Sequence, residues 1–175
     1  MKLATISLDD GHERDRGVIE VLDRFGIKAT FYITCGMVSR LDPAWYAEHE
    51  IGNHTMTHPR KGLRDVLALA SEVGSAMALL QKWSGQEVKP FAYPCGKATI
   101  EYAIAARDAG HTMARTYAID PENAYQIPEP FLVPVTGYLD KPISWPLVQS
   151  LLDAGKPIHL AGHGKHFADE VQLRS

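Results

Sequence analysis

Short apolar segments typical of β-strands alternate along this chain with longer amphipathic segments typical of helices. The pattern predicts strands at 2–8, 28–34, 50–53, 89–93, 111–117, 131–135 and 157–161, and helices at 13–25, 43–49, 63–83, 99–109 and 144–154, with a polar loop at 120–130. This alternation favours a parallel sheet with helices packed against it. No glycine-rich phosphate loop follows the first strand, which weakens the nucleotide-binding version of such a fold. The chain therefore predicts an α/β fold, either a barrel or an open doubly wound sheet.

Composition limits the classes of partner. With 175 residues, 45% of them hydrophobic, the chain is expected to form one domain over 1–175 with a real core. A net charge of -3 with scattered Lys and Arg gives no case for a nucleic-acid partner or an anionic membrane. No apolar stretch reaches the roughly 20 residues that span a bilayer. The first strand starts just after Met1, so no signal peptide is visible and we expect a cytoplasmic protein, with a secreted protein that has lost its leader as the alternative.

Two adjacent carboxylates, Asp9 and Asp10, stand where the first strand should end, followed by Gly11. Burying either one without a partner would cost several kcal/mol. Successive side chains of a strand point to opposite sides. One carboxylate can then bind a cation while its neighbour takes a proton. The alternative is a solvated turn, because Asp and Gly are ordinary turn residues.

A pair of histidines four residues apart, His54 and His58, follows the predicted third strand. At this spacing both rings can reach one ion, from a helical face or a tight loop. Asp10 would complete a three-ligand set that leaves positions open for water and substrate. These donors suit one divalent ion, zinc above all, although cobalt, nickel or manganese can take the same ligands. The alternative is three unrelated polar residues on loops.

Polar residues also follow other predicted strands. Pro94 and Cys95 come after the fourth strand, Arg115 ends the fifth, and His163 follows the seventh. Parallel α/β folds place their sites at the carboxyl ends of the strands. We therefore expect all these clusters to meet at one rim.

Four short motifs carry a resemblance to a known family. They are SLDDG at 7–11, GNHTMTHP at 52–59, FAYPCG at 91–96 and GHG at 162–164. In this order they resemble the motifs of the polysaccharide deacetylases, the NodB-like carbohydrate esterases of family four. The resemblance implies a deformed (β/α) barrel, here with about seven parallel strands and incompletely closed. It also implies a metal-dependent hydrolase that removes N- or O-linked acetyl groups from a sugar or polysaccharide by attack of a metal-bound water.

The resemblance also implies a role for each matching residue. Asp9 matches the catalytic base, and His163 matches the catalytic acid. Asp10, His54 and His58 match the metal ligands. A divalent ion at these ligands would lower the pKa of a water molecule and polarise the acetyl carbonyl.

The third motif departs from the family pattern at two positions. The family has an arginine that orients the catalytic aspartate, and the matching residue here is Ala92. We expect Arg115, at the end of the next strand, to supply that guanidinium group. The usual aromatic residue is replaced by Cys95, whose backbone N–H, after Pro94, would help to stabilise the oxyanion.

Tyr93, Pro94, Cys95 and Leu160 are the candidates for substrate contacts. Tyr93 is placed to stack on a sugar ring, and Leu160 to line a pocket for the acetyl methyl group, with core packing as the alternative for Leu160. The chain ends soon after His163, so any helix that closes the barrel is expected to be short or absent. The first and seventh strands would then lie at an open edge or be covered by a partner subunit of a homo-oligomer.

Two other functions remain open at this stage. Some relatives of this fold open cyclic amides or ureides, as allantoinase does, so a small amide is an alternative to an acetylated carbohydrate. A non-catalytic carbohydrate-binding relative is the second alternative. The presence of a complete set of candidate ligands, base and acid argues against it, because a chain without catalysis has no need of them.

Overall fold

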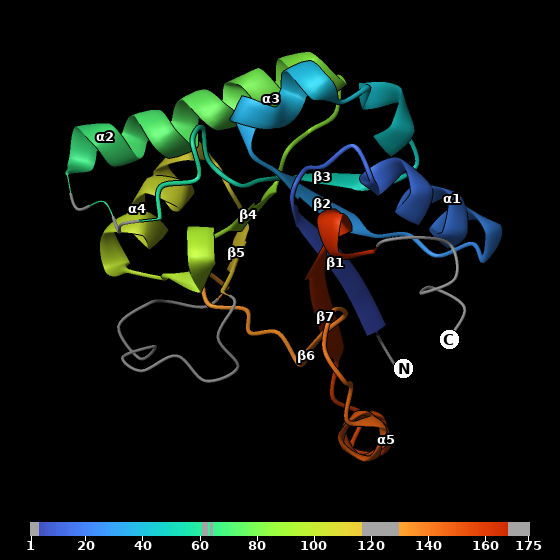
Figure 1. The fold of residues 1–175 in the computed structure, drawn as a ribbon. Helices are drawn as coiled ribbons and strands as arrows, with labels where there is room; N and C mark the ends of the chain where they lie inside the picture. Colours follow the sequence, from blue (N-terminus) through green and yellow to red (C-terminus); the bar gives the residue numbers. More distant parts are fainter. Residues whose placement is uncertain (1–3, 61–62, 64, 117–129, 168–175) are drawn as a thin grey trace.

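A computed structural model describes residues 4–60, 63, 65–116 and 130–167. The strands form one parallel sheet in the order β5-β4-β3-β2-β1-β7-β6. Their bounds are β1 Ala4–Asp10, β2 Thr30–Ile33, β3 Glu50–Asn53, β4 Pro90–Ala92, β5 Met113–Arg115, β6 Gly137–Tyr138 and β7 Ile158–His163. The sheet is open and strongly curled, like half a barrel (Figure 1). This confirms the predicted α/β fold and its incomplete closure.

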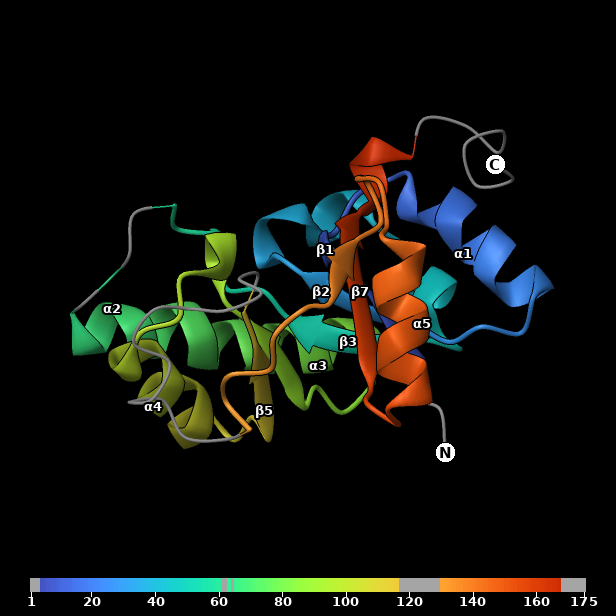
Figure 2. The ribbon, with the colours of Figure 1, turned by 90° about the horizontal axis from the view of Figure 1, so that it is seen from below.

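The helices lie around the outside of the curled sheet (Figures 1 and 2). They are α1 Asp15–Arg24, α2 Val66–Ala70, α3 Ala76–Ser84, α4 Ile100–Ala109 and α5 Trp145–Asp153. Between α2 and α3, residues Ser71–Ser75 form a π-helical turn, so the long helix predicted over 63–83 is continuous but widened in its middle. The helix predicted at 43–49 is a short 3-10 turn, Pro43–Tyr46.

The apolar core lies between the sheet and these outer helices. One cluster joins the outward side chains of β1–β3, such as Leu8, Phe31 and Ile51, to α1 and α3. A second cluster joins Phe91 to α4, where Tyr102 packs. Because side chains alternate along a strand, the other half of them face the inside of the curl. That inner face is polar, and it carries the candidate site.

The segment that follows residue 130 connects the two edges of the sheet. Val133 donates its N–H to the carbonyl of Ala114 beside β5 at 2.9 Å, and Leu139 then donates to Ala161 of β7 at 2.7 Å. The strand predicted at 131–135 is therefore wrong in its bounds. Val133 makes one isolated bridge with Arg115, and the sixth strand is β6.

The expectation of an exposed edge at the first and seventh strands is also wrong. β1 and β7 pair with each other from Ala4↔Ile158 to Asp9↔His163, and the edges of the sheet are β5 and β6. The polar loop predicted at 120–130 lies almost entirely outside the described residues. Within the described ranges, no helix is long and apolar enough to cross a membrane.

Candidate metal centre and active site

The carboxyl ends of the strands surround an open cavity of about 700 Å³. Among the described residues, its lining includes most of the predicted site: Asp9, Asp10, His54, His58, Cys95 and His163. Each of these residues ends a strand or follows one directly or by a few residues, which is why the topology brings them to one rim.

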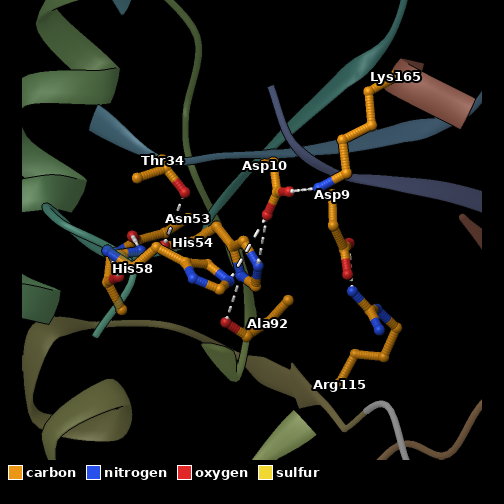
Figure 3. Close-up of polar contacts among 10 residues, drawn as sticks. Asp9, Asp10, Thr34, Asn53, His54, His58, Ala92, Arg115 and Lys165 are labelled. Atoms are coloured by element: carbon orange, nitrogen blue, oxygen red, sulfur yellow. Dashed lines mark hydrogen bonds and ion pairs between the residues drawn. The ribbon is translucent and has the colours of Figure 1, made fainter. Parts of the chain in front are cut away.

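Three of these side chains converge as a possible metal centre (Figure 3). The Nε2 atoms of His54 and His58 lie 3.7 and 3.5 Å from Oδ1 of Asp10. Ligand atoms about 2.0–2.1 Å from a tetrahedral zinc ion stand roughly 3.3 Å apart, so this spacing fits an ion with little movement. The arrangement brings together the three residues that the sequence pattern groups as ligands.

A hydrogen bond to its second ring nitrogen orients His54, one of these ligands. Nδ1 of His54 lies 2.8 Å from the carbonyl oxygen of Ala92. An N–H at this position donates to that oxygen and leaves the Nε2 lone pair facing Asp10. Burial lowers the pKa of His54, which favours the neutral ring that a metal needs.

Lys165 is a neighbour that the sequence did not reveal. Its Nζ donates to Oδ2 of Asp10 at 2.6 Å, while Oδ1 faces the histidines (Figure 3). Burial acts to raise the pKa of Asp10, but the hydrogen bond from Lys165 and nearby positive charges outweigh it and hold that pKa below its ordinary value. The carboxylate therefore stays ionised and ready to bind a cation.

Asp9 is paired with Arg115 inside the curled sheet (Figure 3). Both side chains are buried, with exposed fractions of 4% and 1%. The guanidinium carbon lies 4.9 Å from the centre of the Tyr32 ring. That ring lies over Gly52, where a Cβ atom would stand only 2.3 Å from it. The expected contact between Arg115 and Asp9 is present, and its role in catalysis stays a prediction.

Backbone strain is concentrated at this rim. Within the described part of the chain, four residues other than glycine have positive φ: Asp10 (75°), Thr55 (70°), His58 (54°) and Cys95 (55°). A positive φ is unfavourable for side chains with a Cβ, most of all for a β-branched threonine. Such strain persists only where surrounding contacts hold it, and it is frequent at functional sites.

The π-turn between α2 and α3 holds the loop that carries both histidines. Glu72 of this turn accepts the N–H of Thr57 at 3.0 Å and its hydroxyl at 2.7 Å. The carbonyl of Val73 accepts Nδ2 of Asn53 at 2.9 Å, and Oδ1 of Asn53 accepts the N–H of Thr55 at 2.8 Å. The loop conformation therefore depends on a feature of the long helix.

Three predicted substrate contacts lie away from the cavity. Among the described residues, the lining omits Tyr93, Pro94 and Leu160. Tyr93 is a core residue, 1% exposed, whose hydroxyl donates to the carbonyl of Phe131 at 2.9 Å. Alternation along β7 places Leu160 on the face opposite to His163. Cys95 is exposed and does line the cavity.

Comparisons with known proteins agree with this architecture. Residues 1–114 match the family model described as polysaccharide deacetylase. The match covers more than half of the chain, which therefore belongs to the polysaccharide deacetylase family. The chain is also 34% identical over 114 residues to a gellan lyase of a Bacillus species; this alignment covers 59% of the chain and 4% of that much longer protein.

Solved structures share the fold at low sequence identity. A polysaccharide deacetylase of Bacillus cereus superposes with a TM-score of 0.67 at 17% identity, covering 99% of this chain and 84% of its own. The Streptococcus pyogenes deacetylase PplD, solved in complex with acetate, gives 0.65 at 17%, covering 74% and 62%. A CE4 family pseudoenzyme of Bacillus anthracis also gives 0.65 at 17%, covering 99% and 59%. The chain thus spans about three fifths of the length of the last two.

Proposed function

We propose that this chain is a metal-dependent hydrolase that removes acetyl groups from a carbohydrate. The observation that carries the proposal is that two adjacent carboxylates line one cavity and contact different partners. Asp10 faces two imidazoles, whereas the adjacent Asp9 faces a buried guanidinium. This division gives one acid the environment of a ligand and the other that of a base.

The fit of the Asp10, His54 and His58 donors supports one divalent ion, with zinc as the best match to two imidazoles and a carboxylate. Cobalt, nickel and manganese are alternatives for the same donors. When bound, such an ion would act as a Lewis acid on the acetyl carbonyl and lower the pKa of a water molecule.

The protein's own residues then move the protons. Asp9, held in one orientation by Arg115, takes the proton of the attacking water. The N–H of Cys95, at the rim after Pro94, would donate to the developing oxyanion; such a donor typically contributes about 3 kcal/mol. His163 gives a proton to the departing amine or alcohol. Burial holds the pKa of His163 below its ordinary value, although the charges of Asp9 and Asp10 act against this.

The test combines metal content with acetate release. Wild-type protein, stripped by a chelator and reloaded with zinc, should release acetate from N-acetylated chitooligosaccharides or O-acetylated xylooligosaccharides only after reloading. Asp9→Asn should keep the ion and lose at least about 100-fold in kcat, because a general base contributes 10²–10⁴-fold. Asp108→Asn, at the exposed surface of α4, is the matched control.

Two outcomes would favour other functions. Hydrolysis of cyclic ureides in place of acetylated sugars would assign the site to an allantoinase-like amide hydrolase. Binding of oligosaccharides with no hydrolysis of any acetylated substrate would place the chain with non-catalytic relatives, a class that the Bacillus anthracis pseudoenzyme exemplifies within this fold.

A further inference from the structure

A second group of metal-binding side chains lies beside the candidate centre. Asp140, His163 and His166 each offer one donor atom, and these atoms lie within 4.8 Å of one another. Nδ1 of His166 is 2.8 Å from Oδ2 of Asp140. The rings of His163 and His166 have centroids 5.0 Å apart. Two of the three residues take no part in the proposed reaction.

Two elements bring this second group together. β6 ends at Tyr138, which pairs with Ala161 of β7, and Asp140 follows in the turn after β6. His163 directly precedes the 3-10 turn Gly164–His166. His163 ends β7 and His166 ends this turn, and the centroids of their rings lie 5.0 Å apart.

The same turn is anchored to the rest of the fold. Nη1 of Arg14 donates to the carbonyl of Lys165 at 3.0 Å. The Lys165 side chain itself reaches toward Asp10 (Figure 3). The turn that follows His163 and carries His166 is therefore held to α1's entry by the hydrogen bond from Arg14 to Lys165.

The donor chemistry suits a divalent transition metal. Two imidazoles and one carboxylate are the same donor set as that of Asp10, His54 and His58, so the same ions fit both groups. The contact between His166 and Asp140 needs to open by only about half an ångström to reach the spacing of zinc ligands. His166 is 40% exposed, which gives an ion access but costs side-chain freedom on binding. This group should therefore bind more weakly than the buried one.

We propose that Asp140, His163 and His166 form a second divalent-cation site whose occupation inhibits the enzyme. A histidine ring with one nitrogen bound to an ion cannot become an imidazolium, which is the form that gives up a proton near neutral pH. An ion at this site therefore removes His163 from its role as proton donor while leaving the ion at Asp10 in place. The inhibitory effect rests on the proposed function, whereas the site itself does not.

Zinc stoichiometry tests the site without reference to activity. Isothermal titration calorimetry of the metal-free protein with zinc alone should show that each chain binds one ion tightly and a second ion more weakly. His166→Ala and Asp140→Asn should each weaken only the second ion, by at least tenfold. His12→Ala is the matched control, because His12 lines the cavity of the candidate centre and belongs to neither donor set. A single ion in the wild type, or a second ion unchanged in both variants, would overturn the site.

Acetate release tests the inhibition. The wild-type rate should rise with the first ion and fall as zinc fills the second site, whereas His166→Ala should keep the rise and lose the fall. An identical fall in His166→Ala would overturn the inhibitory role. A wild type that binds two ions and releases no acetate at any zinc concentration would contradict the proposed function and leave the second site standing.

Discussion

At the scale of single residues, the pairing of Asp9 with Arg115 is the contact on which the account depends most. Both side chains are buried, and the guanidinium also packs on Tyr32. Removing one member of a buried ion pair leaves an uncompensated charge, at a cost of about 3–5 kcal/mol. Arg115 therefore holds the base in place and also stabilises the fold.

We predict that Arg115→Met lowers the free energy of unfolding by about 3–5 kcal/mol, measured by denaturant titration. Arg115→Lys keeps the charge but loses the planar fork that orients the carboxylate, so kcat should fall while zinc affinity stays constant. Arg107→Met, which removes an exposed partner of Asp108, is the control and should cost no more than about 1 kcal/mol. A lysine variant with wild-type kcat would show that Arg115 does not position the base.

Residue types and spacing predicted which residues line the cavity better than they predicted the side chains that contact those residues. Asp9, Asp10, His54, His58 and His163 all line one cavity, as their places at strand ends indicated. Lys165 escaped prediction because its contact with Asp10 joins the two ends of the described chain and has no local pattern.

Apolar candidates were harder to place. Tyr93 and Leu160 sit next to site residues in sequence, but alternation along a strand sends neighbouring side chains to opposite faces. Which face receives the substrate depends on the curl of the whole sheet. This is why Tyr93 proved to be a core residue.

At the scale of elements, the π-turn Ser71–Ser75 links the long outer helix to the loop that carries both histidines. Periodicity predicted a regular helix, but the wider π-turn changes which side chains face the core: Val66 and Leu67 are exposed before it, whereas Val73 and Leu80 are buried. π-turns are frequent at functional sites. Here Glu72 and Val73 supply acceptors to the loop.

We expect Glu72→Ala to weaken zinc binding by about tenfold, because Thr57 loses both of its contacts and the strained loop relaxes. Calorimetric titration of metal-free protein would measure the change. Glu87→Ala serves as the control, since Glu87 pairs with Lys89 at the exposed surface, away from the loop. Equal zinc affinities in the two variants would mean that the turn does not support the loop.

Strand order and edges were less predictable than the strands themselves. Among the described residues, the sequence indicated every α-helix and most strands within a few residues, since these follow local periodicity. The pairing of β1 with β7, and the crossing of 130–139 from β5 to β7, are contacts between distant segments. Nothing in local sequence encodes them, which explains the misplaced sixth strand and the wrong edge.

At the scale of the whole molecule, Asp15 joins three parts of the fold below the site. Its Oδ2 accepts the N–H of His12 at 2.9 Å and the hydroxyl of Tyr46 at 3.0 Å. On its other side lies Gly164, where a Cβ atom would clash with Oδ1 at 1.9 Å. Burial raises the pKa of Asp15 to about 6.

Because of this raised pKa, the free energy of unfolding should decrease as the pH rises. The unfolded chain releases the Asp15 proton near pH 4 and the folded chain near pH 6. Between these values the folded state binds more protons, so the free energy of unfolding falls as the pH rises. We predict that Asp15→Asn, which stays neutral, gains about 2–3 kcal/mol relative to wild type between pH 4 and pH 7.

Denaturant titrations of both proteins across this range would measure the difference. Asp108→Asn, at the exposed surface of α4, should show no such gain. A constant difference between Asp15→Asn and wild type would mean that Asp15 titrates as an ordinary carboxyl group.

The two adjacent carboxylates at the end of β1 are proposed to have different roles, Asp10 as a metal ligand and Asp9 as the base. Diffraction at the zinc absorption edge, from crystals grown with one equivalent of zinc, distinguishes these roles. We predict one strong anomalous peak bonded to Asp10, His54 and His58 at about 2.0–2.2 Å, with Asp9 still paired with Arg115. A peak bonded to Asp9, or one that lacks both histidines, would contradict the account.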